Sequence, residues 1–133
     1  GCDDVPRCTV PDGHWPWTRQ APAIEIRDGD AIGDGPEVCR LLRSRAIEHV
    51  LIMGVHLNMC VLGRPFGIRQ LVGLGFDVAL VRDLTDTMYN PRRRPFLTHH
   101  EGTERVVEHV ERYWAPSITS DQVLGGRPFQ FSP

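Results

Sequence analysis

The sequence contains no lysine, so all fifteen of its basic residues are arginine. Because an arginine side chain keeps its proton in proteins, these cations can stabilise negative charge but are poor proton shuttles. The formal net charge is −2, which provides no overall electrostatic case for binding nucleic acid or an anionic membrane. The one concentrated basic run, residues 92–94, lies between two prolines and is better explained as a solvated loop than as a phosphate clamp.

Long apolar runs are also missing: none reaches the ~18 residues that would cross a membrane, and no signal peptide is visible. We therefore expect a soluble protein, with the cytoplasm favoured as its location. The chain begins with Gly1 and not with methionine, so its natural start is expected to lie elsewhere, and export by a signal removed with it stays an alternative. Hydrophobic residues make up 41% of the 133 positions, enough for the core of one domain or part of one.

Cysteines are few, and four do not make a disulfide framework in a chain of this size. Cys39 and Cys60 fall in predicted regular elements and are expected to be unpaired. Cys2 and Cys8 lie in a leader rich in proline and aspartate, where they could pair with each other or bind a metal with His14. Their spacing matches no standard zinc pattern, so we expect no cofactor, with a divalent metal as the lesser alternative.

Residues 1–22 show little periodicity and are predicted to form an irregular arm. Trp15 and Trp17 are expected to be buried aromatics of that arm. The rarer alternative is a wall that stacks against a substrate, which makes Trp17 a candidate substrate-binding residue.

The rest of the chain alternates segments of strand length with helical patterns. Strands are expected at 23–26, 49–55, 76–81 and within 117–124, and helices within 33–47, at 59–74 and at 101–114. Asp34 is expected to cap the first helix, Pro65 to kink or to start the second, and residues 83–95 to form a loop. The apolar run HVLIMGV at 49–55 is typical of a central parallel strand covered on both faces. The pattern predicts an α/β fold, a three-layer, Rossmann-like parallel sheet flanked by helices.

Cys60 lies close to the carboxyl end of the predicted strand 49–55, the edge where open α/β sheets carry their sites. The loop of residues 56–60 opens onto this edge, and Cys60 is expected at the start of the next helix. Unpaired backbone N–H groups at a helix start stabilise a thiolate. On position and spacing alone, a packed structural thiol and a nucleophile are equally supported.

The segment MGVHLNMCVLGRPFGIRQLVGLGFDVALVRDLTD, residues 53–86, resembles the core signature of the isochorismatase-like cysteine hydrolases, which include nicotinamidases and N-carbamoylsarcosine amidases. The shared pattern is a hydrophobic strand, Gly-Val, a four-residue turn, Cys-Val, a helix ending in glycine, and a second hydrophobic strand followed by aspartate. WPWTRQ, RDLTDTMYNP and VVEHVERYW are similar to a little-characterised bacterial subgroup. The resemblance covers nearly the whole chain but only the C-terminal part of the family domain, so residues 23–133 are interpreted as that part.

The resemblance implies roles for single positions around the turn. Cys60 matches the nucleophile, which attacks a carbonyl carbon to form an acyl-enzyme. The Val55–His56 peptide matches a bond that is cis in family members, and the N–H groups of His56 and Cys60 would then form the oxyanion hole. The His56 side chain, which is additional to the family pattern, could equally line a pocket or pack. Asn58, in the same turn, is a candidate substrate-binding residue.

The other two members of the family triad are an aspartate and a lysine. The aspartate, which is the general base, would lie upstream of this sequence. Arg27 falls on the lysine position and could stabilise charge without exchanging a proton. Glu25 or Asp30 could take a different role, although surface residues of an edge strand are the favoured explanation for all three. Asp83 resembles the strand-end aspartate of the family, as a loop organiser or substrate-binding residue.

Four further polar residues are weaker candidates. Asp86 and Thr87 follow Asp83 in the predicted loop, and His99 and His100 precede the last long helix, where Glu101 is expected to cap. The two histidines are expected to be exposed, and a histidine that reaches the pocket is the minor alternative.

The family sheet has the order 3-2-1-4-5-6, and the strands predicted in this chain correspond to 3, 4, 5 and 6. We therefore expect preceding polypeptide or a second chain to complete the sheet, and the isolated chain to lack normal turnover. The predicted function is a cysteine hydrolase acting on an amide or related bond of a small molecule. The alternative is a non-catalytic binding or scaffold domain. A homo-oligomer is also expected, through the tryptophan arm or residues 84–95.

Overall fold

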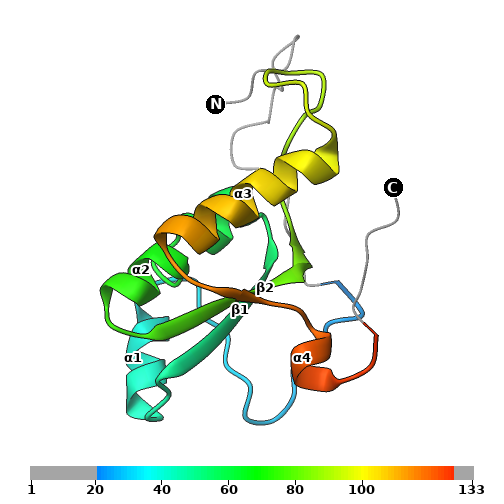
Figure 1. Ribbon diagram of the computed structural model, residues 1–133. Helices are drawn as coiled ribbons and strands as arrows, with labels where there is room; N and C mark the ends of the chain where they lie inside the picture. Colours follow the sequence, from blue (N-terminus) through cyan, green and yellow to red (C-terminus); the bar gives the residue numbers. More distant parts are fainter. Residues whose placement is uncertain (1–20, 128–133) are drawn as a thin grey trace, which may run out of the picture. The chain divides into compact units, whose positions relative to one another are not determined.

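The computed structural model describes residues 21–127, which fall into two units, residues 21–32 and residues 33–127. The larger unit is a small α/β fold with a three-stranded, all-parallel sheet in the order β1–β2–β3 (Figure 1). Its elements are α1 (Glu37–Ser44), β1 (His49–Val55), η1 (Leu57–Val61), α2 (Ile68–Gly73), β2 (Asp77–Asp86), α3 (His99–Tyr113), β3 (Ser117–Ile118) and α4 (Asp121–Leu124). The predicted α/β class and parallel sheet are confirmed. No helix within the described range is long and apolar enough to cross a membrane.

The core of the larger unit lies against one face of the sheet. Residues 50 and 52 of β1 pair with residues 78 and 80 of β2, so their side chains share this face. The helical elements supply the other half of the core, and Figure 1 shows α2 and α3 on the same side of the strands. The largest fully buried side chains are those of Leu57, Ile68, Leu71, Leu80, Val81 and Val110.

β1 is an edge strand in the described part of the chain, pairing there only with β2. Its bounds agree with the predicted strand, but the expectation that both faces are covered is wrong. Burial alternates along the strand, and Leu51, Met53 and Val55 are 46%, 48% and 59% exposed. Within residues 33–127 no further strand or helix lies over that face to bury them.

The helix predicted over residues 59–74 is instead two pieces. The first is η1, a π-helical turn, and the second is α2. Proline has no N–H to continue the helix, and Pro65 lies in a turn closed by the hydrogen bond from Gly67 N–H to the Arg64 carbonyl, 2.7 Å. Gly67 starts α2 with extended backbone, and it packs tightly: a Cβ there would lie 2.8 Å from the carbonyl oxygen of Val61 and 3.0 Å from that of Cys60.

β2 is longer than the predicted strand 76–81, so the expectation that Asp83 begins a loop is wrong. The strand continues to Asp86 through a large irregularity: between the pairs Ile52–Leu80 and Gly54–Thr85, β1 advances by two residues and β2 by five. Gly54 lies in β1 at this irregularity and has a φ of 109°, a conformation that glycine adopts readily. The Thr85 hydroxyl donates to the Gly54 carbonyl at 2.7 Å, which joins the strands again beyond the bulge.

Two expectations for residues 21–36 are also wrong. Residues 23–26 form no strand. Two turns occupy this part of the chain: the Ile24 N–H donates to the Ala21 carbonyl, and the Asp30 N–H donates to the Arg27 carbonyl. Every residue from 21 to 32 is exposed. A strand needs a neighbouring strand to pair with, and none is present in this unit. Asp34 does not cap α1. Instead the Glu37 carboxylate reaches back to accept the N–H groups of Asp34 and Gly35, each at 2.8 Å.

α3 starts two residues earlier than predicted, so both histidines are in its first turn. Its N-cap is Thr98 and not Glu101 as expected; Glu101 is the third residue of the helix, where its side chain completes a capping box with Thr98. The loop before α3 packs closely on it, because a Cβ at Gly102 would lie 2.5 Å from the Tyr89 ring. The absence of a side chain at Gly102 therefore lets the Tyr89 ring pack directly against α3.

Candidate functional site

Cys60 is the fourth residue of η1, and η1 follows the carboxyl end of β1 after a single residue. The His56 carbonyl accepts the N–H groups of Met59 at 3.0 Å and Val61 at 3.3 Å, which folds the chain back directly after the strand. The Val55–His56 peptide is cis, as the resemblance implies. His56 and Cys60 are both half-buried. No side chain in the described part of the chain hydrogen-bonds to the Cys60 sulfur, and π-helical turns of this kind are frequent at functional sites.

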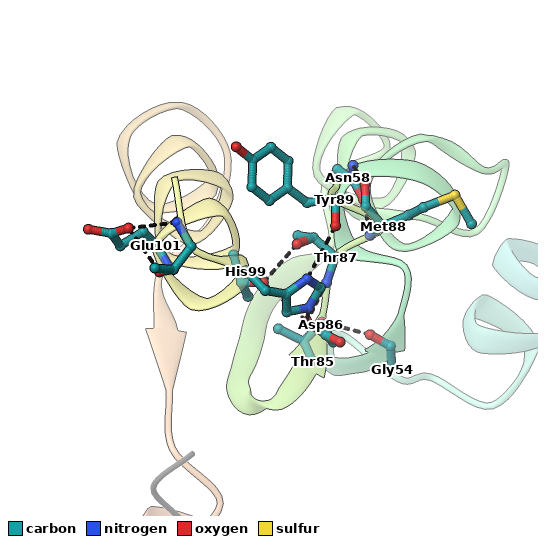
Figure 2. A network of polar contacts seen from close by, with 11 residues as sticks. Gly54, Asn58, Thr85, Asp86, Thr87, Met88, Tyr89, His99 and Glu101 are labelled. Carbon is teal, nitrogen blue, oxygen red and sulfur yellow. Dashed lines mark hydrogen bonds and ion pairs between the residues drawn. The ribbon is translucent and has the colours of Figure 1, made fainter. Parts of the chain in front are cut away.

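Asn58 connects η1 to the segment that follows β2 (Figure 2). Its amide nitrogen donates to the Met88 carbonyl and its amide oxygen accepts the Met88 N–H, both at 3.0 Å. This two-point contact has the pattern of a backbone pair between neighbouring strands. The Asn58 amide, predicted to bind substrate, therefore already binds main chain.

Asp86 and His99 form an ion pair at the carboxyl end of β2 (Figure 2). His99 Nε2 lies 2.7 Å from Asp86 Oδ1, and its Nδ1 lies 3.3 Å from the Tyr89 carbonyl oxygen. Both ring nitrogens thus face acceptors, so the doubly protonated imidazolium fits best. The hydrogen bond to Asp86 is the main cause that raises the pKa of His99. Both ring nitrogens are therefore occupied by contacts within the protein.

The Asp86 carboxylate is held by three donors. Burial raises the pKa of Asp86, but hydrogen bonds from the Thr87 N–H, His99 and the Thr103 hydroxyl outweigh it and lower the pKa overall. The Thr87 hydroxyl in turn lies 2.7 Å from that of Thr103, which is in α3. This network joins the end of β2 to α3, and it places Asp86, Thr87 and His99 in one structural cluster.

Asp83 is buried in β2, where its two carboxylate oxygens accept the Ser120 N–H at 2.8 Å and the Ser120 hydroxyl at 2.6 Å. Burial raises the pKa of Asp83, but the hydrogen bonds from Ser120, with smaller contributions from its own backbone N–H and the charge of Arg82, lower the pKa overall. Asp83 therefore organises the segment between β3 and α4.

Arg27 lies on an exposed turn in the unit of residues 21–32. Its guanidinium is 3.3 Å from Glu25, with both side chains more than 70% exposed, and its N–H donates to Asp30 at 2.8 Å. Such an exposed pair adds little stability. Trp17, together with Cys2, Cys8 and His14, lies outside the described residues.

A cleft of about 760 Å³ is lined by residues of α3 and β2 and by Thr119. Five carboxylates line it, those of Asp83, Asp86, Glu104, Glu108 and Glu111. This surface was not expected from the sequence, although the three glutamates recur at the four- and three-residue spacing of one helix face. Cys60 and His56 are not among its lining residues. In the described ranges, no three His, Cys, Asp or Glu side chains are grouped so that they could hold a metal ion.

The structure thus brings His56, Asn58 and Cys60 together at one turn after β1, and Asp86, Thr87 and His99 at the end of β2, with Asn58 joining the two places. Asp83 lines the same cleft as Asp86, but its carboxylate is bonded to Ser120. Searches of protein-family models, curated proteins and solved structures found no match to this chain.

Proposed function

We propose that the chain belongs to a cysteine hydrolase with a three-layer, isochorismatase-like fold, and that Cys60 is its nucleophile. One observation carries the proposal: a half-exposed thiol lies on a π-helical turn at the carboxyl end of a parallel strand. This edge is where α/β folds place reactive groups, because the chain there leaves the sheet and its side chains become accessible.

The proposed reaction is hydrolysis of an amide or related bond in a small molecule, without a cofactor. The Cys60 sulfur attacks the carbonyl carbon, the C–N bond breaks, and the amine leaves with a proton. Water then cleaves the resulting thioester to release a carboxylic acid and regenerate the thiol. The N–H groups of His56 and Cys60 would stabilise the oxyanion.

The thiol must also give up its proton, and His99 is engaged elsewhere by Asp86 and Tyr89. In the family that the sequence resembles, an aspartate upstream of this segment accepts that proton. Arg27, on the family's lysine position, would stabilise negative charge and not transfer a proton.

The test is site-resolved alkylation of the full-length protein with iodoacetamide at pH 7, followed by peptide mapping. Cys39 is an internal reference, because it is buried and its thiol lies 3.7 Å from the Pro65 carbonyl oxygen. We expect Cys60 to react at least tenfold faster than it does in the urea-denatured protein, and we expect Cys39 to stay protected. A Cys60 rate no higher than the denatured rate would refute the proposal.

The alternative is a non-catalytic binding or scaffold domain. The observation that favours it is the lack of any polar side-chain partner for the Cys60 sulfur among residues 21–127. Under this alternative the Cys60→Ala variant of the full-length protein would keep its cellular function. Loss of that function, with an unchanged unfolding midpoint, would reject it.

A further inference from the structure

We infer that Asn58 is a positioning residue for Cys60, because its side chain fastens η1 to the backbone of the chain that follows β2. This inference rests on the proposed function, since it concerns the orientation of the proposed nucleophile. It assigns Asn58 a role different from the direct substrate binding that the sequence favoured.

The geometry of the amide supports this assignment. An asparagine side chain carries both donors and an acceptor, and Asn58 presents one of each to a single residue, Met88, at equal distances of 3.0 Å. Met88 belongs to a stretch that is itself immobilised: its neighbour Thr87 is buried and bonded to both Asp86 and Thr103. Asn58 is therefore tied to the firmly held end of β2 and, through it, to α3.

The Asn58–Met88 contact lies on the same short turn as Cys60, where it can affect the orientation of the thiol. η1 has only five residues and is anchored on its inner side by the buried side chains of Leu57 and Val61. Asn58 adds a second anchor, polar and exposed, on the outer side of the same turn. Since no described side chain bonds to the Cys60 sulfur, the backbone of η1 sets the directions that the thiol can take as its side chain rotates. Two anchors on opposite sides of a short turn fix that backbone against rotation.

The exposure of Asn58 makes the inference testable, because truncating an exposed side chain leaves the apolar core in place. The experiment compares Asn58→Ala with the matched control Asn90→Ala in the full-length protein. Asn90 also makes a side-chain to backbone bond, accepting the Arg92 N–H at 2.9 Å, but within its own loop. Cys60 and Cys39 alkylation by iodoacetamide is followed by peptide mapping from pH 6 to pH 9, with thermal unfolding measured alongside.

We expect Asn58→Ala to lower the Cys60 rate at pH 7 at least fivefold and to displace its pH profile, while Cys39 stays protected. Asn90→Ala should leave both unchanged. A Cys60 rate and pH profile in Asn58→Ala equal to those of the unmodified protein would overturn the inference and leave the proposed function standing. An unreactive Cys60 in the unmodified protein would instead remove the proposed function itself.

If Asn58→Ala exposes Cys39 as fully as denaturant does, the neutral Asn58→Ser variant decides. Serine adds no charge beside the thiol, and its short side chain carries a single oxygen that cannot replace both amide contacts to Met88. A folded Asn58→Ser protein with a slowed, displaced Cys60 profile supports positioning, and an unchanged profile overturns it.

Discussion

At the scale of single residues, Gly54 is the position where the backbone most restricts the choice of side chain. Its φ of 109° is a conformation that L side chains rarely adopt, although a Cβ there would meet no atom within 4 Å. Conformation alone therefore favours glycine at this position, which lies at the irregularity between β1 and β2.

We expect Gly54→Ala to lower the free energy of unfolding by about 1–3 kcal/mol, because alanine must adopt a strained backbone there. The matched control is Gly73→Ala at the end of α2, where a Cβ also meets nothing within 4 Å and φ is not positive. That substitution should be neutral or stabilising by up to ~1 kcal/mol. Urea denaturation of both variants checks the prediction, and equal effects would contradict it.

The Asp86–His99 pair predicts a pH dependence of stability. The pKa of His99 is raised above 6.5, so its contribution is complete below about pH 6.5 and is lost as the pH rises through the raised value. The pKa of Asp86 is lowered below 3.8, so its contribution is present above about pH 3.8 and is lost as the pH falls through the lowered value. The pair therefore stabilises most between about pH 4 and pH 6.5.

A His99→Gln variant checks this dependence, since glutamine keeps a donor for Asp86 but does not titrate. Both side chains of the pair are partly exposed, at 39% and 45%, so the effect should not exceed about 1 kcal/mol. We expect the unmodified protein to lose unfolding free energy relative to His99→Gln between pH 6 and pH 9 in urea titrations. If the unfolding free energies of the two proteins change with pH in parallel between pH 6 and pH 9, the pairing with Asp86 does not keep His99 charged.

At the scale of elements, α3 depends on how its first turn is closed. The Thr98 hydroxyl accepts the Glu101 N–H at 3.3 Å, and the Glu101 carboxylate accepts the Thr98 N–H at 2.7 Å. We expect Thr98→Ala to cost about 0.5–2 kcal/mol, because it leaves a helix N–H without its acceptor. Thr98→Ser keeps the hydroxyl and should retain most of that stability, as measured by thermal unfolding with circular dichroism. Equal losses in the two variants would exclude the hydroxyl as the cause.

Elements with strong local signals could be predicted from sequence, and elements that depend on distant partners could not. HVLIMGV is recognisable as β1 from its apolar run, and Thr98 and Glu101 have the spacing of a capping box. The extension of β2 to Asp86 depends instead on the bulge opposite Gly54, which has no local signature. Residues 23–26 alternate like a strand, but a strand forms only with a partner.

The same distinction holds for the candidate site. The position of Cys60 just after a strand follows from chain order and could be predicted. The hydrogen bonds between Asn58 and Met88 join residues thirty positions apart, and the ion pair of His99 with Asp86 depends on how α3 packs against the end of β2. Such contacts arise only after the elements pack, so sequence could suggest these residues but not their partners.

At the scale of the whole molecule, the apolar side chains on the outer face of β1 predict self-association. Leu51, Met53 and Val55 are exposed in a row on a strand that pairs on one side only within residues 21–127. Edge strands with apolar side chains and few charges readily pair with other chains, and a second copy is always present at equal concentration. We expect concentration-dependent dimers of the 133-residue chain on its own, where a second copy would cover the β1 edge, and we expect Met53→Arg to weaken them.

Light scattering over a hundredfold range of concentration measures this association. The control is Leu124→Arg, because Leu124 is 82% exposed but lies in α4, away from the strand. A monomer at all concentrations, or an equal effect of the two arginine variants, would contradict the prediction.

The close approach of Gly67 to the turn that carries Cys60 has a consequence for how the sequence can vary. The smallest side chain at residue 67 would push against main-chain oxygens of Val61 and Cys60, which cannot swing aside as a flexible side chain can. Four residues earlier, Gly63 borders open space and has no such constraint. In a saturation library selected for folded protein, residue 67 should remain almost exclusively glycine, whereas many residue types should be accepted at position 63. The backbone shape of η1 would therefore be preserved among folded variants by the glycine at residue 67.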